Sequence, residues 1–237
     1  MDLGTQRRRR VVLTGAAGGV GQILLPALTA AYDVVATDRV RPAVEESARA
    51  PVEVVVGDLT APGFLAEITR GADAIVHLAA NPDPNATWEQ LRSPNVEAVV
   101  GVLETDVPRV VLASSVHAMG QYLAEPETPV DPAWPPSPCC PYGATKAFGE
   151  ALGRMSAYRT GRTVVALRLG ATTRRPPASS ALAGWLGPED LHQLVRRALI
   201  ADVRFEVCHG ISANTRSVFS VRNHLGYVPE LDSEEYA

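Results

Sequence analysis

The chain has 237 residues, of which 46% are hydrophobic and 20% charged, and a formal net charge of -4. This composition predicts a globular protein and gives no reason to expect a nucleic-acid partner. No apolar run approaches the roughly 18 residues that a membrane-spanning helix needs, and the N-terminal residues do not resemble a signal peptide. Three cysteines do not make a disulfide framework, so a reducing, cytoplasmic environment is expected.

A glycine-rich turn joins the first predicted strand, residues 11–14, to the first predicted helix, residues 20–31. The turn contains Gly15, Gly18, Gly19, Val20 and Gly21. At this spacing the first glycine permits a tight turn, Gly18 lets a pyrophosphate approach, and Gly21 lets the helix contact the strand. The N–H groups at the helix N-terminus favour phosphate. The stretch therefore predicts a dinucleotide site; the alternative is an ordinary strand–helix junction that is rich in glycine.

Strands and helices alternate after this turn, a pattern typical of βαβ units in a parallel sheet that is covered on both faces. We expect further strands at 33–38, 52–56, 72–80, 107–113 and 163–169, and helices near 63–70, 87–104 (interrupted near Pro94) and 142–159. The prediction is one α/β domain over residues 1–237, a Rossmann-type doubly wound parallel sheet. Residues 7–169 would form the cofactor-binding core and residues 170–237 a small C-terminal substrate lobe.

Asp38 ends the second predicted strand, about 20 residues beyond the glycine turn, where an acid can bind both hydroxyls of the adenosine ribose. A carboxylate there also repels a 2′-phosphate and so favours NAD over NADP. The neighbouring Arg39 weakens this preference, and a strand-end cap is the alternative role for Asp38.

Two further predicted strand ends face the same crevice, because ligands bind beyond the carboxyl ends of parallel strands. Asp58 and Leu59 follow the third strand, and Asp58 either accepts a hydrogen bond from adenine or caps the next helix. The fourth strand runs into a turn at Leu78, Ala79 and Ala80, where small residues let the backbone lie against a cofactor. His77 lies within an apolar run, which favours a core histidine over a catalyst.

Tyr142 and Lys146 open a predicted helix, and a spacing of four residues puts them on one face. Lys146 is the only lysine in the chain, which indicates that its position requires a compact ammonium group. Since a phenol with a pKa of about 10 is a poor base at neutral pH, we expect the ammonium to lower the pKa of Tyr142. Ser115, at the end of the fifth strand, can bind the substrate oxygen while Tyr142 transfers a proton.

Together these motifs resemble those of the NAD-dependent epimerase/dehydratase family of extended short-chain dehydrogenases/reductases. The resemblance rests on the glycine turn, Asp38, residues 57–59, residues 77–80, Asn95, Ser114-Ser115 and Tyr142-x-x-x-Lys146. It implies that NAD is the cofactor and that Ser115, Tyr142 and Lys146 are catalytic. It also implies that Lys146 and Asn95 belong to the cofactor site, and that a homodimer pairs through the helices after Asn95 and near Tyr142.

Within that family the chain is most similar to the uronate dehydrogenases, which oxidise the anomeric carbon of a hexuronic acid to a lactone. The similarity lies in residues 113–117, 141–150, 167–170, 210–214 and 223–227. It implies a substrate site containing Ser115, His117, Tyr142 and Ala171; the alternative role for His117 is a structural hydrogen bond. Only 68 residues follow Leu169, which favours a small substrate over a nucleotide sugar.

Several polar residues of those enzymes are replaced here. Val116 stands where they have an asparagine, Ala171 where they have a serine, and Ser180 where they have the arginine that holds the carboxylate. Arg174 and Arg175 either serve in place of that arginine or are solvated loop charges. The resemblance is therefore closer for the cofactor half than for the substrate half.

The expected function is that of an NAD-dependent oxidoreductase, which transfers a hydride between a sugar or sugar acid, such as a hexuronate, and NAD. One alternative is a sugar epimerase or dehydratase in which the oxidation is transient. Another is a dinucleotide sensor or scaffold, although such proteins often lose the tyrosine or the lysine. No metal site is expected, because Cys139, Cys140 and Cys208 lack metal-ligand spacing.

Overall fold

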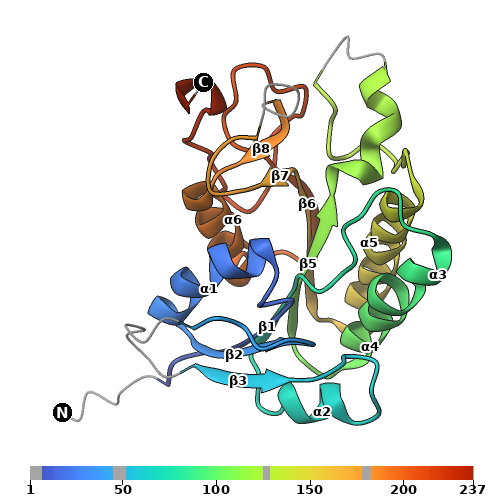
Figure 1. Cartoon of the computed structure of the whole chain (residues 1–237), viewed down its shortest axis with the longest axis vertical. Helices are drawn as coiled ribbons and strands as arrows, with labels where there is room; N and C mark the ends of the chain where they lie inside the picture. Colours follow the sequence, from blue (N-terminus) through green and yellow to red (C-terminus); the bar gives the residue numbers. More distant parts are fainter. Residues whose placement is uncertain (1–6, 45–51, 125–128, 178–182, 237) are drawn as a thin grey trace.

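The computed structural model describes residues 7–44, 52–124, 129–177 and 183–236. A seven-stranded sheet with the order β3-β2-β1-β4-β5-β6-β9 forms its centre (Figure 1). The strands are β1 (Arg10–Thr14), β2 (Asp33–Asp38), β3 (Glu53–Val56), β4 (Ala74–His77), β5 (Arg109–Ser115), β6 (Thr163–Leu169) and β9 (Phe205–Gly210). Each neighbouring pair is parallel. The predicted α/β fold with a doubly wound parallel sheet is confirmed.

Helices cover both faces of this sheet. The helices α1 (Gly19–Ala31) and α6 (Pro188–Ile200) pack on one face, and α2 (Phe64–Ile68), α4 (Ala98–Glu104) and α5 (Pro141–Thr160) pack on the other. Because side chains alternate along a strand, Val11 and Leu13 of β1 face the first pair of helices, whereas Val12 faces the second group. Both faces of the central strands are therefore buried.

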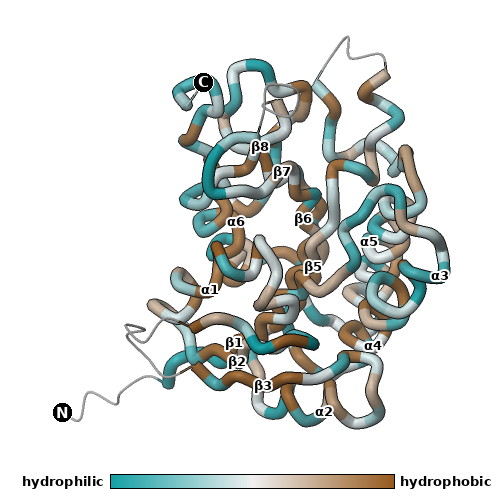
Figure 2. Tube along the Cα trace, viewed as in Figure 1, coloured by the Kyte–Doolittle hydropathy of each residue, from teal (hydrophilic) through white to brown (hydrophobic). Residues whose placement is uncertain are grey.

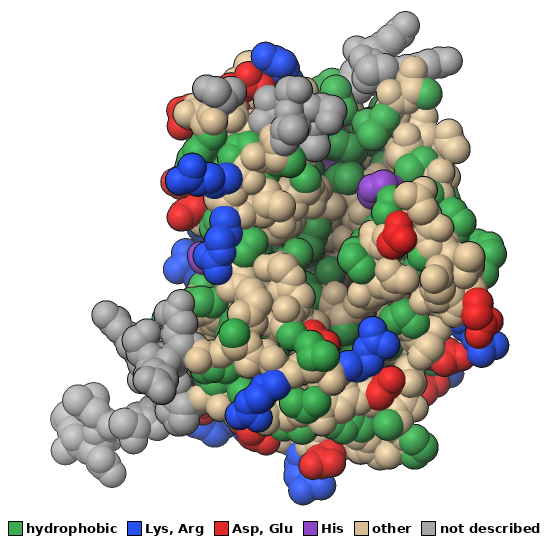
Figure 3. Space-filling model, viewed as in Figure 1, with side chains coloured by type: hydrophobic (Ala, Val, Ile, Leu, Met, Phe, Trp, Pro, Cys, Tyr) green, Lys and Arg blue, Asp and Glu red, His purple; other side chains and the backbone are tan. Residues whose placement is uncertain are grey.

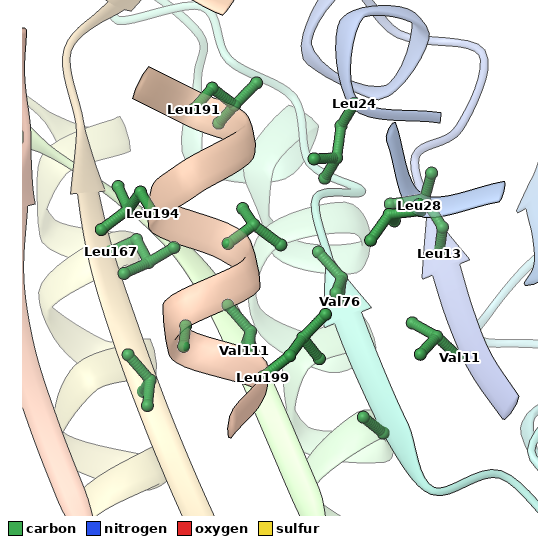
Figure 4. Packing of buried hydrophobic residues seen from close by; sticks show 14 of the residues in the cluster. Val11, Leu13, Leu24, Leu28, Val76, Val111, Leu167, Leu191, Leu194 and Leu199 are labelled. Atoms are coloured by element: carbon green, nitrogen blue, oxygen red, sulfur yellow. The ribbon is translucent and has the colours of Figure 1, made fainter. Parts of the chain in front are cut away.

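Leucines from two helices close the core on the α1 and α6 side. Figure 4 shows them against strand residues such as Val76 and Leu167, and Figure 2 shows the same apolar interior along the strands. The leucines labelled on the helices are Leu24, Leu28, Leu191, Leu194 and Leu199. This packing fixes the positions of the strands, and so of the loops that extend from their carboxyl ends.

The helical segment between β4 and β5 is interrupted where the sequence predicted. It runs as α3 (Trp88–Leu91), a π-helical turn (Arg92–Glu97) and α4. Pro94 has no N–H group and so cannot continue the α-helical hydrogen bonds, which accounts for the widened turn. Asn95 is buried within this turn.

The segment after residue 169 completes the sheet as well as forming the smaller part of the molecule. Helix α6 covers one face of the sheet, and β9 pairs with β6 along its length. A separate parallel pair, β7 (Ala171–Thr172) and β8 (Trp185–Leu186), lies beyond the sheet. The boundary predicted at residue 169 therefore needs correction, because residues 188–210 belong to the sheet and its cover and not to a separate lobe.

Two expectations from composition can be compared with the described residues. Within those ranges no helix is both long and apolar enough to cross a lipid bilayer. Cys139, Cys140 and Cys208 carry free thiols.

Candidate active site

The carboxyl ends of the strands open into a cleft above β1 and β4, where the direction of the strand order reverses. Ligands of open α/β sheets bind at such a position. A cavity of about 670 Å³ lies between the glycine turn, the end of β5, the start of α5 and several C-terminal segments. A smaller cavity of about 130 Å³ continues it toward β2 and β3. Figure 3 shows a hollow lined by apolar side chains and backbone, with most of the charged side chains around its margin.

The glycine turn brings backbone to the floor of both cavities. Gly15 has a φ of 70°, and a Cβ atom there would lie 2.6 Å from the nitrogen of Ala79. A Cβ atom on Gly21 would lie 2.3 Å from the carbonyl oxygen of Gly15. The steric reasons predicted for these two glycines are therefore confirmed.

The positions between them leave the backbone accessible. Gly18 is the N-cap of α1, and a Cβ atom on Gly19 would meet nothing within 4 Å. Gly18, Gly19, Val20 and Gly21 line the larger cavity. The open N-terminus of α1 fits a phosphate group, because its N–H groups have no partner within the helix.

Asp38 lines the smaller cavity at the end of β2, together with Arg39. Its Oδ2 accepts a hydrogen bond from the N–H of Ala17 at 3.0 Å, and its Oδ1 accepts one from the N–H of Arg39 at 2.7 Å. The carboxylate is thus fixed by the glycine turn itself, in a position that suits a ribose.

Asp58 and Leu59 line the same cavity, as do Leu78, Ala79 and Ala80. The Oδ1 of Asp58 accepts hydrogen bonds from the N–H and the hydroxyl of Thr60, and these bonds lower the pKa of Asp58. Asp58 therefore caps its own turn and also lines the cavity, so the two predicted roles do not exclude each other. The sequence analysis missed Ser93 and Pro94, which reach the cavity from the π-helical turn.

Ser115, Tyr142 and Lys146 come together on the wall of the larger cavity. Ser115 ends β5, and the other two lie on the first turns of α5. The Nζ of Lys146 donates a hydrogen bond to the carbonyl of Ala113 at 2.8 Å and lies 5.6 Å from the centroid of the Tyr142 ring. Burial lowers the pKa of Lys146 to about 8.

The predicted lowering of the Tyr142 pKa by Lys146 is wrong for the chain alone. Burial raises the pKa of the phenol, and Cys140 raises it further, whereas a hydrogen bond with Ser115 lowers it. The ammonium is itself buried and bound to Ala113, so its attraction does not offset the cost of removing a phenolate from water.

His117 lines the larger cavity and also makes structural contacts. Its ring lies edge-on to the Tyr142 ring, with 5.6 Å between centroids. Its Nδ1 lies 3.4 Å from the Sγ of Cys140 and 3.6 Å from the Sγ of Cys139. Both predicted roles of His117 are therefore compatible with the structure. This cluster was not predicted, because the three cysteines alone lack metal-ligand spacing and His117 lies 22 residues before the first of them.

Asn95 is buried in the π-helical turn and supports the site through hydrogen bonds, and its place in the cofactor site stays a prediction. Its Nδ2 donates to the carbonyl of Asn81 at 3.0 Å and to the Oγ1 of Thr145 at 3.1 Å, and its Oδ1 accepts from the N–H of Asn81 at 2.8 Å. The wide π-helical turn aims the side chain at α5, so Asn95 ties the loop after β4 to the catalytic helix.

A buried charged network next to the candidate catalytic residues was not predicted. Glu150 of α5 accepts two hydrogen bonds from Arg168 of β6, at 2.8 and 2.7 Å, and one from the hydroxyl of Ser114 at 2.5 Å. Arg168 also donates to the carbonyl of Pro132 at 3.1 Å. The network joins α5, β5, β6 and the loop before α5, and so positions the helix that carries Tyr142.

His77 is buried at the end of β4, with its Nδ1 2.8 Å from the hydroxyl of Thr14. Burial lowers its pKa to about 3. The prediction of a core histidine is confirmed.

The substrate side of the larger cavity is formed mainly by residues that had no sequence signal. Ala171 lines it as predicted, together with Thr172, Gly184, Val218 and Phe219, which were missed. Within the described ranges Lys146 is the only charged residue on the cavity wall.

The two candidate arginines for a substrate carboxylate do not line that wall. Arg174 is exposed and donates to the carbonyl of Gln22 at 3.4 Å, and Arg175 is exposed as well. The interpretation of both as loop charges is therefore supported. Ser180 lies outside the described residues.

Sequence comparisons identify relatives along nearly the whole chain. An NAD-dependent glucose-6-phosphate dehydrogenase of Haloferax volcanii is 33% identical over 95% of each chain. A uronate dehydrogenase of Pseudomonas putida is 32% identical over 96% of this chain and 86% of its own. An L-arabinose 1-dehydrogenase (NAD(P)(+)) of Haloferax volcanii is 33% identical over 82% of this chain and 84% of its own.

Solved structures agree with these relatives. A glucuronic acid dehydrogenase from Chromohalobacter salexigens matches with a TM-score of 0.87 and 30% identity, over 97% of this chain and 87% of its own. A tyrosine-to-alanine mutant of the uronate dehydrogenase from Agrobacterium tumefaciens, complexed with NAD, matches with a TM-score of 0.85 and 27% identity, over 96% and 87%. A family model, the NAD dependent epimerase/dehydratase family, matches residues 11–172. By fold, by sequence and by the NAD dependence of its relatives, this chain is an enzyme that belongs to the NAD-dependent epimerase/dehydratase family.

Proposed function

We propose that the protein oxidises the anomeric hydroxyl of a small sugar or sugar acid to a lactone and releases NADH. The convergence of Ser115, Tyr142 and Lys146 on one wall of the larger cavity carries this proposal. Names of three relatives support the substrate class, since they act on a uronate, glucose 6-phosphate and L-arabinose.

Each of the three side chains has a role that its position supports. Tyr142 is the general base that takes the proton of the substrate hydroxyl, and Ser115 donates a hydrogen bond that orients the same oxygen. Lys146 is fixed by the carbonyl of Ala113 and presents its charge beside the phenol. Because burial keeps the pKa of Tyr142 high in the chain alone, further positive charge in the cleft is needed to make the phenolate accessible.

The cofactor site would hold NAD along both cavities. Gly18 and Gly19 would approach the pyrophosphate at the N-terminus of α1, and Asp38 would bind the ribose hydroxyls. Bound NAD supplies the hydride acceptor. The largely apolar side chains of the cavity wall would keep water away from the reacting atoms.

The direct test is a panel of uronates, neutral aldoses and aldose phosphates assayed with NAD. We expect NADH to accumulate in stoichiometric amounts with at least one panel member, together with a lactone product. Conversion of a sugar with no net NADH would support an epimerase or dehydratase instead. NAD binding without any conversion would favour the sensor function.

The homodimer stays a prediction. Sedimentation of the purified chain would test it independently of the activity.

A further inference from the structure

His117, Cys139 and Cys140 place three soft ligand atoms next to the substrate side of the cleft. The Nδ1 of His117 and the two Sγ atoms all lie within 4.8 Å of one another. The two distances from Nδ1 are 3.4 Å to Cys140 and 3.6 Å to Cys139. In a tetrahedral zinc site with Zn–S of about 2.3 Å and Zn–N of about 2.0 Å, the N···S edge is about 3.5 Å. Both N···S distances in the cluster therefore already match those of such a site.

Two glycines make room for this cluster. A Cβ atom on Gly120 would lie 2.2 Å from the Sγ of Cys139, and one on Gly143 would lie 2.3 Å from the carbonyl oxygen of His117. Both positions are therefore closed to any larger residue unless the ligands move. The cluster therefore requires residues without a side chain at Gly120 and Gly143.

Backbone hydrogen bonds hold the three residues in register. The N–H of Cys139 donates to the carbonyl of His117 at 3.3 Å, and the N–H of Ser137 donates to the carbonyl of Ala118 at 2.8 Å. Cys140 is the N-cap of α5, and its Sγ accepts a hydrogen bond from the N–H of Gly143 at 3.4 Å. A helix N-terminus stabilises a thiolate, the form of cysteine that binds metals.

We propose that His117, Cys139 and Cys140 bind one thiophilic divalent cation, with Zn²⁺ as the leading candidate, and that water fills the fourth position. Two thiolates and one imidazole form a ligand set that zinc accepts, and a fourth position without a protein ligand is typical of open zinc sites. Binding would displace the two thiol protons into solvent. Cys139 is exposed, so the ion has a direct route to the cluster.

The position of the cluster implies a consequence for catalysis, which rests on the proposed dehydrogenase function. His117 lines the larger cavity and packs against the ring of Tyr142. An ion held by its Nδ1 fixes that ring and places the water bound to the ion at the entrance for the sugar. We expect zinc to inhibit turnover by competing with the sugar and not with NAD.

Cobalt(II) tests the site without reference to activity. The full-length chain, reduced with a phosphine that does not bind metals, is titrated with Co²⁺. We expect one equivalent to produce thiolate-to-cobalt charge-transfer bands and the intense visible bands of a tetrahedral ion, and Zn²⁺ to abolish both. Absence of charge-transfer bands at one equivalent would overturn the proposal.

Matched variants locate the ligands. Cys139→Ser and Cys140→Ser should each weaken metal affinity by at least about 100-fold, the upper end of the effect of altering residues that only support the ligands. Cys208→Ala, which removes a buried thiol of β9 far from the cluster in the sheet, should retain full affinity. Equal affinity in Cys139→Ser and the unmodified chain would contradict the assignment.

The inhibition is tested on Cys139→Ser, whose side chain does not line the cavity. Zinc should no longer inhibit whatever dehydrogenase activity this variant has, whereas Cys208→Ala should be inhibited by zinc as strongly as the unmodified chain. If no sugar is oxidised but the cobalt spectrum appears, the metal site holds and the proposed function fails; the two failures are thus distinguishable.

Discussion

Backbone atoms of the glycine turn and of neighbouring strand ends form one side of the cleft, whereas its other side is formed by side chains from distant segments. Gly15, Gly18 and Asp38 lie within 24 residues of one another. The N–H of Gly18 donates to the carbonyl of Gly15, and the carboxylate of Asp38 accepts from the N–H of Ala17 between them. Ala171 of β7 and Phe219, on the opposite side, come from segments separated by α6 and β9. A cofactor common to many enzymes can thus be recognised by local backbone geometry, while the substrate depends on tertiary packing.

The largest expected effect comes from Tyr142, which lies between the two sides. Tyr142→Phe removes the proposed general base without changing the volume of the side chain much, so turnover should fall by about 10²- to 10⁴-fold. NAD affinity, measured by calorimetry, should change little, since the glycine turn is untouched. Retention of turnover would show that the phenol is not the base.

A large loss of stability is expected where α5 is joined to β6. Arg168→Met leaves the Glu150 carboxylate buried without its cation, which should cost about 3–5 kcal/mol in the free energy of unfolding. Denaturant titration measures this loss. The double variant Glu150→Gln with Arg168→Met should recover much of it, because the unpaired charge is gone. If the single variant proves as stable as the unmodified chain, the pair does not hold the catalytic helix.

The cofactor side alone is tested by Asp38→Asn. The amide keeps an acceptor for the N–H of Ala17 but loses the charge, so NAD should bind about tenfold more weakly, the usual difference between charged and neutral hydrogen bonds. NADP should bind more tightly, because repulsion of its 2′-phosphate is relieved. Asp58→Asn is the control and should leave the preference between the two cofactors unchanged.

Lowering the pH should reduce the free energy of unfolding through a buried histidine of β4, beneath the cofactor side of the cleft. The pKa of His77 is lowered to about 3 in the folded chain, so between pH of about 6.5 and 3 only the unfolded chain takes up this proton. The free energy of unfolding should therefore fall as pH falls, by up to about 1.4 kcal/mol per pH unit from this residue. His209, whose pKa is lowered to about 4, adds to the same slope.

His77→Asn, which retains a partner for the hydroxyl of Thr14, should flatten the dependence by about one proton. Denaturant titrations at several pH values measure this pH dependence of the free energy of unfolding.

The smallest effect is expected on the substrate side. Ala171→Ser adds a hydroxyl to the cavity wall, and one new hydrogen bond to a sugar acid would lower KM by about two- to tenfold. The Kd for NAD should be unaffected. A parallel change in NAD affinity would mean that the two sides of the cleft are not independent.

Local sequence patterns were sufficient to predict the strands from β1 to β6 and most residues around the cofactor cavities. Apolar runs predict strands that are buried on both faces, and the requirement for glycine at Gly15 and Gly21 is steric and local. Helix α6 and strand β9 were not predicted. Their place in the fold becomes clear only from the pairing of β9 with β6.

The remaining site features could not be predicted because they depend on contacts between segments far apart in the sequence. The side chain of Asn95 turns toward α5 through a π-helical turn, and His117 meets cysteines 22 and 23 residues away. The pKa of Tyr142 is set by burial, which a spacing of four residues to Lys146 does not reveal.

One consequence of the amino-acid composition extends beyond catalysis. Because the chain contains one lysine, and its ε-amine is buried against the carbonyl of Ala113, the remainder of the described surface presents its positive charge as guanidinium. Amine-directed reagents and lysine-directed enzymes therefore have a single side-chain amine to modify, which lies on the wall of the larger cavity. Modification of that amine would report occupancy of the cleft, and the exterior could be engineered with new lysines for attachment at chosen points.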